Sequence, residues 1–126
     1  MKNITTYINE SNANHTIFNA CIELDNNEDI YNTQYWPLVK NLINVHKSGD
    51  FKIETLEKSS VVSKLATATL KSAKAGNLST NDRKRLYKFI VGNILKTISD
   101  EGEDLTKEEE DYMIEWDYNN SDKCGW

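Results

Sequence analysis

The sequence predicts an all-α protein, folded as a small irregular bundle of four to five short helices. Two observations favour this class. Apolar residues recur at three- and four-residue spacing in several segments, and polar stretches with helix-capping residues separate these segments. The 126 residues have the length of one domain. Three Trp, six Tyr and three Phe residues provide material for a core and argue against full disorder.

The first 24 residues carry two apolar patterns. Ile4, Tyr7 and Ile8 have helical spacing, so residues 1–10 are expected to form a short amphipathic segment, followed by a loop over residues 11–15. Residues 16–24 fit both an alternating strand and a helix. Because no other segment offers this strand a partner, we favour a helix or irregular structure there. The helical domain is expected to cover residues 16–118, and residues 119–126 to form a C-terminal tail.

Two helices are expected in the middle of the chain. One should begin near Thr33 with Pro37 in its first turn, and should end at Gly49. Its apolar stripe is Leu38, Val39, Leu42, Ile43 and His46. The next should run from Ile53 to Ala75, stopped by Gly76-Asn77, with an inner stripe of Leu56, Val61 or Val62, Leu65, Thr69, and Ser72 or Ala73. Small side chains over Ala66–Thr69 would let a neighbouring helix approach closely, and would also allow a homodimer.

The last two helices have the clearest signals. Thr80–Ser99 follows a cap at Ser79 with Asp82 three residues later, and its apolar positions are Leu86, Phe89, Ile90, Ile94, Leu95 and Ile98. A second capping box at Thr106 and Glu109 should open a helix that reaches about Tyr118. Its acidic first turn also suits the helix dipole.

Charge is distributed unevenly around the net value of −5. Residues 1–51 hold six acidic and three basic residues (−3), residues 52–96 hold ten basic and three acidic (+7), and residues 97–126 hold eleven acidic and two basic (−9). Such asymmetry indicates electrostatic partners rather than a fold. The basic middle is a candidate nucleic-acid-binding segment that would contact phosphates through Lys71, Lys74, Arg83, Lys84, Arg85 and Lys88. A solvated basic face, or one neutralised by the acidic last helix, is the alternative.

The acidic last helix is a candidate partner-binding surface. Its carboxylates would mimic DNA phosphates in the cleft of a nuclease, with aromatic residues as apolar anchors. The residues proposed for this contact are Glu108, Glu109, Asp111, Tyr112 and Trp116. The alternative is a dense acidic run on a solvated helix, without a partner.

Catalytic signals are weak, so we expect a non-enzymatic protein that needs no cofactor or metal. His15 and His46 lack metal-ligand spacing, and His46 on an apolar stripe is expected at the edge of the core. The sequence has no nucleophile-elbow, P-loop or dinucleotide-binding motif. Cys21 and Cys124 are expected to be reduced thiols in a cytoplasm. No secretory signal peptide and no membrane span are predicted.

The segment Met1-Lys2-Asn3-Ile4-Thr5-Thr6-Tyr7-Ile8-Asn9-Glu10 resembles the capsid-targeting leader of internal head proteins of T-even-type and related tailed phages. In that family, the leader directs a protein into the prohead, and the prohead protease cuts after a Leu/Ile-x-Glu triplet. The matching residues are Ile4, Tyr7, Ile8 and Glu10. The resemblance implies a phage accessory protein of the host cytoplasm or the virion that binds a capsid component. Inhibition of a host defence nuclease would be another protein-binding role.

Overall fold

The computed structural model describes residues 4–118, with side chains from residue 13 onward. Its elements are α1 (Ile4–Asn26), α2 (Glu28–Ile30), the π-helical turn η1 (Tyr31–Tyr35), α3 (Trp36–Lys47), α4 (Ile53–Glu57), α5 (Ser60–Ser72), α6 (Thr80–Asp100) and α7 (Lys107–Trp116). Every regular element within this range is helical, which confirms the predicted all-α class. The expected tail, residues 119–126, lies outside the described residues.

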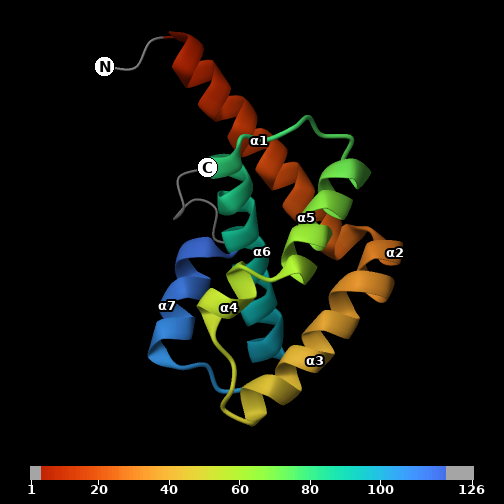
Figure 1. The fold of residues 1–126 in the computed structure, drawn as a ribbon, viewed down its shortest axis with the longest axis vertical. Coiled ribbons are helices and arrows are strands. Elements are labelled where there is room, and N and C mark those ends of the chain that lie inside the picture. The colour runs from red at the N-terminus through yellow and green to blue at the C-terminus, as the bar shows by residue number, and fades with distance from the viewer. Residues whose placement is uncertain (1–3, 119–126) are drawn as a thin grey trace.

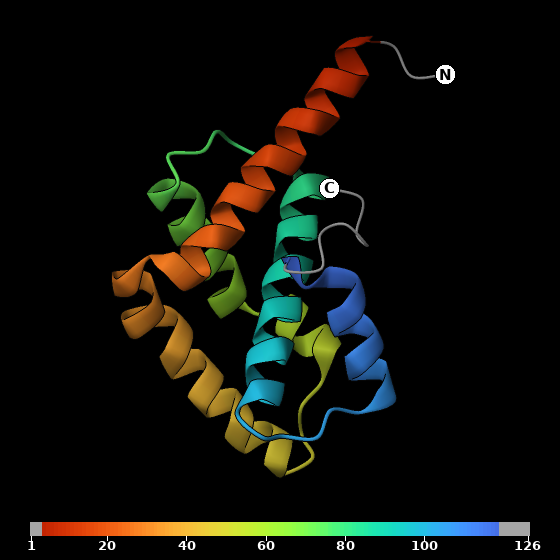
Figure 2. The same ribbon diagram turned by 180° about the vertical axis from the view of Figure 1, so that it is seen from behind.

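Helix α6 forms the centre of the bundle. Figure 1 shows α7 on one side of α6 and α3 and α5 on the other, and Figure 2 shows the same arrangement from behind. The six predicted apolar positions of α6 are all 1% exposed or less. Ser79 caps its first turn as expected, because the Ser79 hydroxyl accepts a hydrogen bond from the Asp82 N–H at 3.2 Å. The prediction of this helix is therefore confirmed.

Helix α1 corrects the predicted loop at residues 11–15, because the helix is continuous from Ile4 to Asn26. That stretch is mostly polar but includes no Gly or Pro, so nothing in it stops a helix. Ile17, Ala20, Cys21 and Leu24 are fully buried and anchor the second half of α1 on the core. The helical interpretation of residues 16–24 is thus confirmed. The first half of α1 extends beyond the rest of the bundle (Figures 1 and 2).

The helical path that leads into α3 begins earlier than the predicted start near Thr33. The Asn27 side chain caps α2 by accepting a hydrogen bond from the Ile30 N–H at 3.0 Å. The wider turn η1 then precedes Pro37, which lies in the first turn of α3 as predicted. Pro37 has no N–H to donate, and its ring would press on the Thr33 carbonyl in a regular helix, so a wider turn accommodates it. Gly49, at φ 83°, follows the end of α3.

The long helix predicted over residues 53–75 is wrong as a single element. It is divided into α4 and α5 at Lys58 and Ser59. Ser59 adopts an extended backbone conformation, and its hydroxyl accepts a hydrogen bond from the Val61 N–H at 3.1 Å, so it starts a new helix. Of the two valines left open by the sequence, Val62 is buried and Val61 is 44% exposed.

The end of α7 packs on α6 at a glycine. Helix α7 has the predicted capping box but ends at Trp116, two residues before the predicted end. A Cβ atom placed on Gly92 would lie 2.7 Å from the backbone N of Asp117 and 2.7 Å from the carbonyl carbon of Trp116. Next to this contact, the Trp116 ring meets the Phe89 ring edge to face, with ring centroids 5.2 Å apart. Gly92 therefore sets the distance between the two helices.

We predict that Gly92→Ala destabilises the protein. Alanine improves helix propensity by up to about 1 kcal/mol, but the added methyl group must push backbone atoms of α7 away, and such overpacking costs about 1–3 kcal/mol. Urea unfolding should show a net loss of free energy. Gly76→Ala is the control, because nothing lies within 4 Å of its Cβ position. Equal stability of the two variants would contradict the close approach.

Candidate functional site

The resemblance to a capsid-targeting leader falls on the first turns of α1. The backbone there is helical from Ile4 onward, while Met1–Asn3 and the side chains of residues 4–12 lie outside the described part. The first described side-chain contact of α1 with the bundle is at Asn14, whose Oδ1 accepts a hydrogen bond from Arg85 Nη2 at 2.7 Å.

Three of the six predicted nucleic-acid-binding residues hold the bundle together. Arg83 on α6 donates to the Tyr87 hydroxyl through Nε at 2.7 Å, and to the Ser63 carbonyl and the Thr67 hydroxyl of α5 through Nη2. Arg85 joins α6 to α1 and also pairs with Asp82 at 3.2 Å. These arginines are therefore structural ties between helices.

Lys88 is the third residue of the basic set that connects helices. Its Nζ lies 3.3 Å from Glu57 Oε1 of α4 and 5.3 Å from the centre of the Trp116 ring of α7. The remaining three residues, Lys71, Lys74 and Lys84, are exposed, and their side chains make no hydrogen bond or ion pair with the described part of the chain. The six residues therefore do not form one uniform basic surface. Three of them connect helices, and the other three are exposed.

The residues of the predicted partner-binding face of α7 also differ in exposure. Glu108 and Asp111 are exposed, but Glu109 is only 6% exposed. Tyr112 is half-buried and donates a hydrogen bond to Glu57 of α4, and Trp116 packs on α6. The expectation of a solvated acidic face is thus wrong at Glu109, because the capping box turns this side chain toward the bundle.

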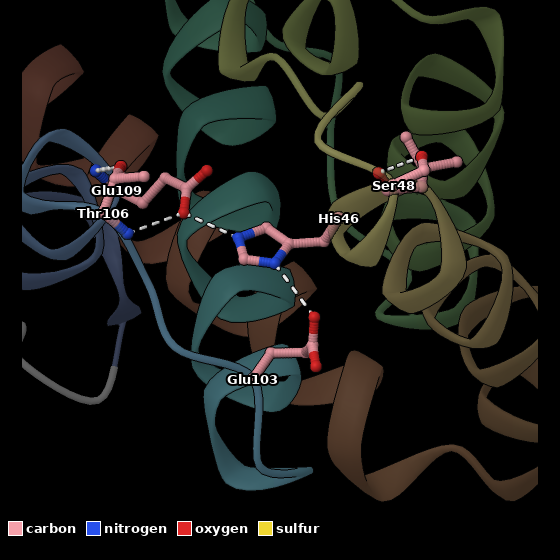
Figure 3. A network of polar contacts seen from close by, with 6 residues as sticks. His46, Ser48, Glu103, Thr106 and Glu109 are labelled. Atoms are coloured by element: carbon pink, nitrogen blue, oxygen red, sulfur yellow. Dashed lines mark hydrogen bonds and ion pairs between the residues drawn. The ribbon is translucent and has the colours of Figure 1, made fainter.

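The imidazole of His46 connects three parts of the fold (Figure 3). Nε2 lies 2.8 Å from Glu109 Oε1 on α7, and Nδ1 lies 3.1 Å from Glu103 Oε1 in the loop between α6 and α7. The same Glu109 oxygen accepts the Thr106 N–H at 2.9 Å. His46 therefore lies at the edge of the core, as expected from its apolar stripe. Its two carboxylate partners are 57 and 63 residues away along the chain, so no local pattern indicates them.

The charge state of His46 follows from these contacts. Burial favours the neutral ring, but hydrogen bonds from both nitrogens to Glu109 and Glu103, together with their negative charges, raise the His46 pKa above its ordinary value. Only the imidazolium form has two N–H donors. Since both nitrogens are engaged, this ring acts as a structural clamp between α3, α7 and the loop that precedes α7.

Other features bear on the expected classes of function. Among the side chains described, those of residues 13–118, no group of three or more His, Cys, Asp or Glu is arranged to hold a metal ion. None of the described helices combines the length and the apolar character that crossing a membrane requires. Cys21 is fully buried. Burial is the main cause that raises the pKa of its thiol, and the negative charges of Asp117 and Asp25 raise it further. Comparison with known proteins gives no match to a family model, a curated protein or a solved structure.

We predict that His46→Gln destabilises the protein by about 1–3 kcal/mol below the ordinary His pKa of 6.5, because hydrogen bonds between charged groups are lost. A group whose pKa is raised on folding contributes fully below its unfolded pKa, and this contribution falls as the pH rises through the folded pKa. The difference in unfolding free energy between wild type and His46→Gln should therefore be largest below pH 6.5 and shrink as the pH rises above it.

Chemical denaturation at several pH values measures this difference. His15→Gln provides the control, since it replaces the other histidine, which is exposed on α1. A stability difference between wild type and His46→Gln that is constant with pH would contradict the clamp.

Proposed function

We propose that this chain is a non-enzymatic accessory protein of a tailed phage that acts by binding another protein, with the first turns of α1 as its docking segment. One observation carries the proposal. Helix α1 is a single helix of 23 residues, buried in its second half, whose first half extends beyond the bundle (Figure 2). A helix that projects from a folded domain is suited to bind in a groove or against a second helix.

The register of α1 supports this role. On a regular helix, positions 4, 7 and 8 lie about 140° around the axis from positions 17, 20, 21 and 24, which face the core. The apolar positions of the leader-like segment thus belong to a different face from the one that anchors α1. This difference explains why α1 as a whole has no single apolar stripe. Positions 4, 7 and 8 therefore lie on a face of α1 that the second half of the helix does not use to pack on the bundle.

The partner class follows from the leader resemblance. Ile8-Asn9-Glu10 is the only Leu/Ile-x-Glu triplet in the sequence. The peptide bond after Glu10 precedes Asn14, the first described contact with the bundle, so cleavage there would leave the packed part of α1 in place. We therefore infer that the partner is a capsid or scaffold component, and that the folded bundle is the cargo. The DNA-mimic and nuclease-inhibitor roles receive less support, since Glu109, Tyr112 and Trp116 turn toward the bundle.

Cleavage at Glu10 tests this proposal. We expect the wild-type chain, when produced together with a T-even-type prohead protease, to become shorter by its first ten residues. Glu10→Gln should stay at full length, because the carboxylate that the protease recognises is absent. Intact-protein mass spectrometry distinguishes the two products. Glu54→Gln is the matched control, as it removes an exposed carboxylate outside any such triplet. An uncut wild-type chain, both with the protease and in mature particles, would rule out this role.

Removal of residues 1–10 should leave the bundle intact. Among the described side chains of α1, which start at residue 13, the first buried one is Ile17 and the first hydrogen bond to the bundle is at Asn14. We therefore expect the free energy of unfolding to change by no more than about 0.5 kcal/mol, as for surface changes away from the core. Urea unfolding of the shortened chain measures this change. A loss of several kcal/mol would show that the segment is part of the folded core rather than a docking segment.

A further inference from the structure

We propose that a hollow between α5 and α6 binds a phosphate group. The hollow has a volume of about 300 Å³ and is closed on one side by the loop of residues 73–79, which joins the two helices in Figure 1. Its charged lining residues are Lys71 and Arg83, and no acidic residue lines it. This inference goes beyond the proposed protein docking and does not depend on it.

Arg83 is held in position before any ligand binds. Its Nε and Nη2 groups donate to Tyr87 on its own helix and to Ser63 and Thr67 on α5, and its guanidinium lies 5.5 Å from the centre of the Tyr87 ring. A guanidinium has five N–H donors. The two on Nη1 make no hydrogen bond with the described residues. A fixed cation with two unused donors binds an anion with little loss of side-chain entropy.

The opposite wall adds further donors. Lys71, near the end of α5, is exposed and has no ion-pair partner in the described part of the chain. The loop bends sharply at Lys74, at φ 54°, and its next residues include Gly76, Asn77 and Leu78. The N–H groups of these three residues donate no hydrogen bond within the described residues. The hollow thus combines two cations with several unused backbone donors.

This chemistry fits a phosphate better than a neutral ligand. A phosphate group offers several acceptor oxygens and one or two negative charges, which match an arginine, a lysine and backbone N–H groups. The nearest acidic residue on α6, Asp82, pairs with Arg85 and Ser79, so its charge is already compensated. The phosphate can be a free ion or part of a nucleic-acid strand. Lys74 and Lys84, exposed and next in sequence to the lining residues, would then follow the strand.

The test is an NMR titration of the ¹⁵N-labelled full chain with sodium phosphate and, separately, with a dT12 oligonucleotide, at constant ionic strength. We expect saturable shifts of the Gly76, Asn77 and Leu78 amides. Lys71→Ala should weaken phosphate binding about five- to tenfold, since it removes one charge-assisted contact. Lys40→Ala is the matched control, because it removes an exposed lysine on α3 and the same charge. The spectra of both variants report whether they remain folded.

Each outcome decides the proposal. Shifts at the loop that saturate with phosphate, and that Lys71→Ala weakens, support it. If dT12 shifts the same amides and competes with phosphate, the ligand is a nucleic-acid backbone, and if only phosphate does so, it is a free ion. Shifts that spread over all exposed lysines, or an equal loss in Lys40→Ala, would show non-specific attraction and overturn the site. The absence of any loop shift with either probe would overturn it as well.

Discussion

The burial of α6 is the constraint on which the rest of the structure depends. Between Phe89 and Leu95 every residue of this helix is buried, so the helix must be covered on all sides. No single neighbour can do this, and α1, α3, α4, α5 and α7 each pack against part of its surface. Gly92 allows the end of α7 to come closest. The buried Asn93 side chain accepts a hydrogen bond from Tyr35, which provides a polar partner inside the apolar core.

The first turns of α6 contact the neighbouring helices through charged residues. Arg83, Arg85 and Lys88 extend from α6 to α5, α1 and α4, respectively. The charged end of each of these side chains contacts a partner on the neighbouring helix. The positive charge of the middle segment is therefore partly a consequence of how neighbouring helices are fixed to α6. The exposed lysines outside these ties, and the two Nη1 N–H groups of Arg83, remain available to a ligand.

The features that could be predicted from the sequence are local ones. The caps at Ser79 and Thr106 act within three residues, so they are visible in the sequence, as is the strong periodicity of α6. The break at Ser59 is not evident from the sequence, because serine is tolerated inside a helix as well as favoured at its start. The clamp at His46 depends on residues more than fifty positions away. The hollow at Lys71 likewise combines residues of two helices and the loop between them, because Arg83 of α6 is turned toward α5.

The two ends of α6 differ in charge, and this difference relates the two proposals to each other. At its first turns, Arg85 contacts Asn14, where α1 leaves the bundle, and Arg83 lines the hollow. At its far end, about 30 Å away for a helix of 21 residues, follow Asp100, Glu101, Glu103 and Asp104. The proposed docking segment and the proposed phosphate site thus lie near the positive end. A negatively charged surface would attract this end and repel the other, and so would turn the projecting part of α1 toward the partner.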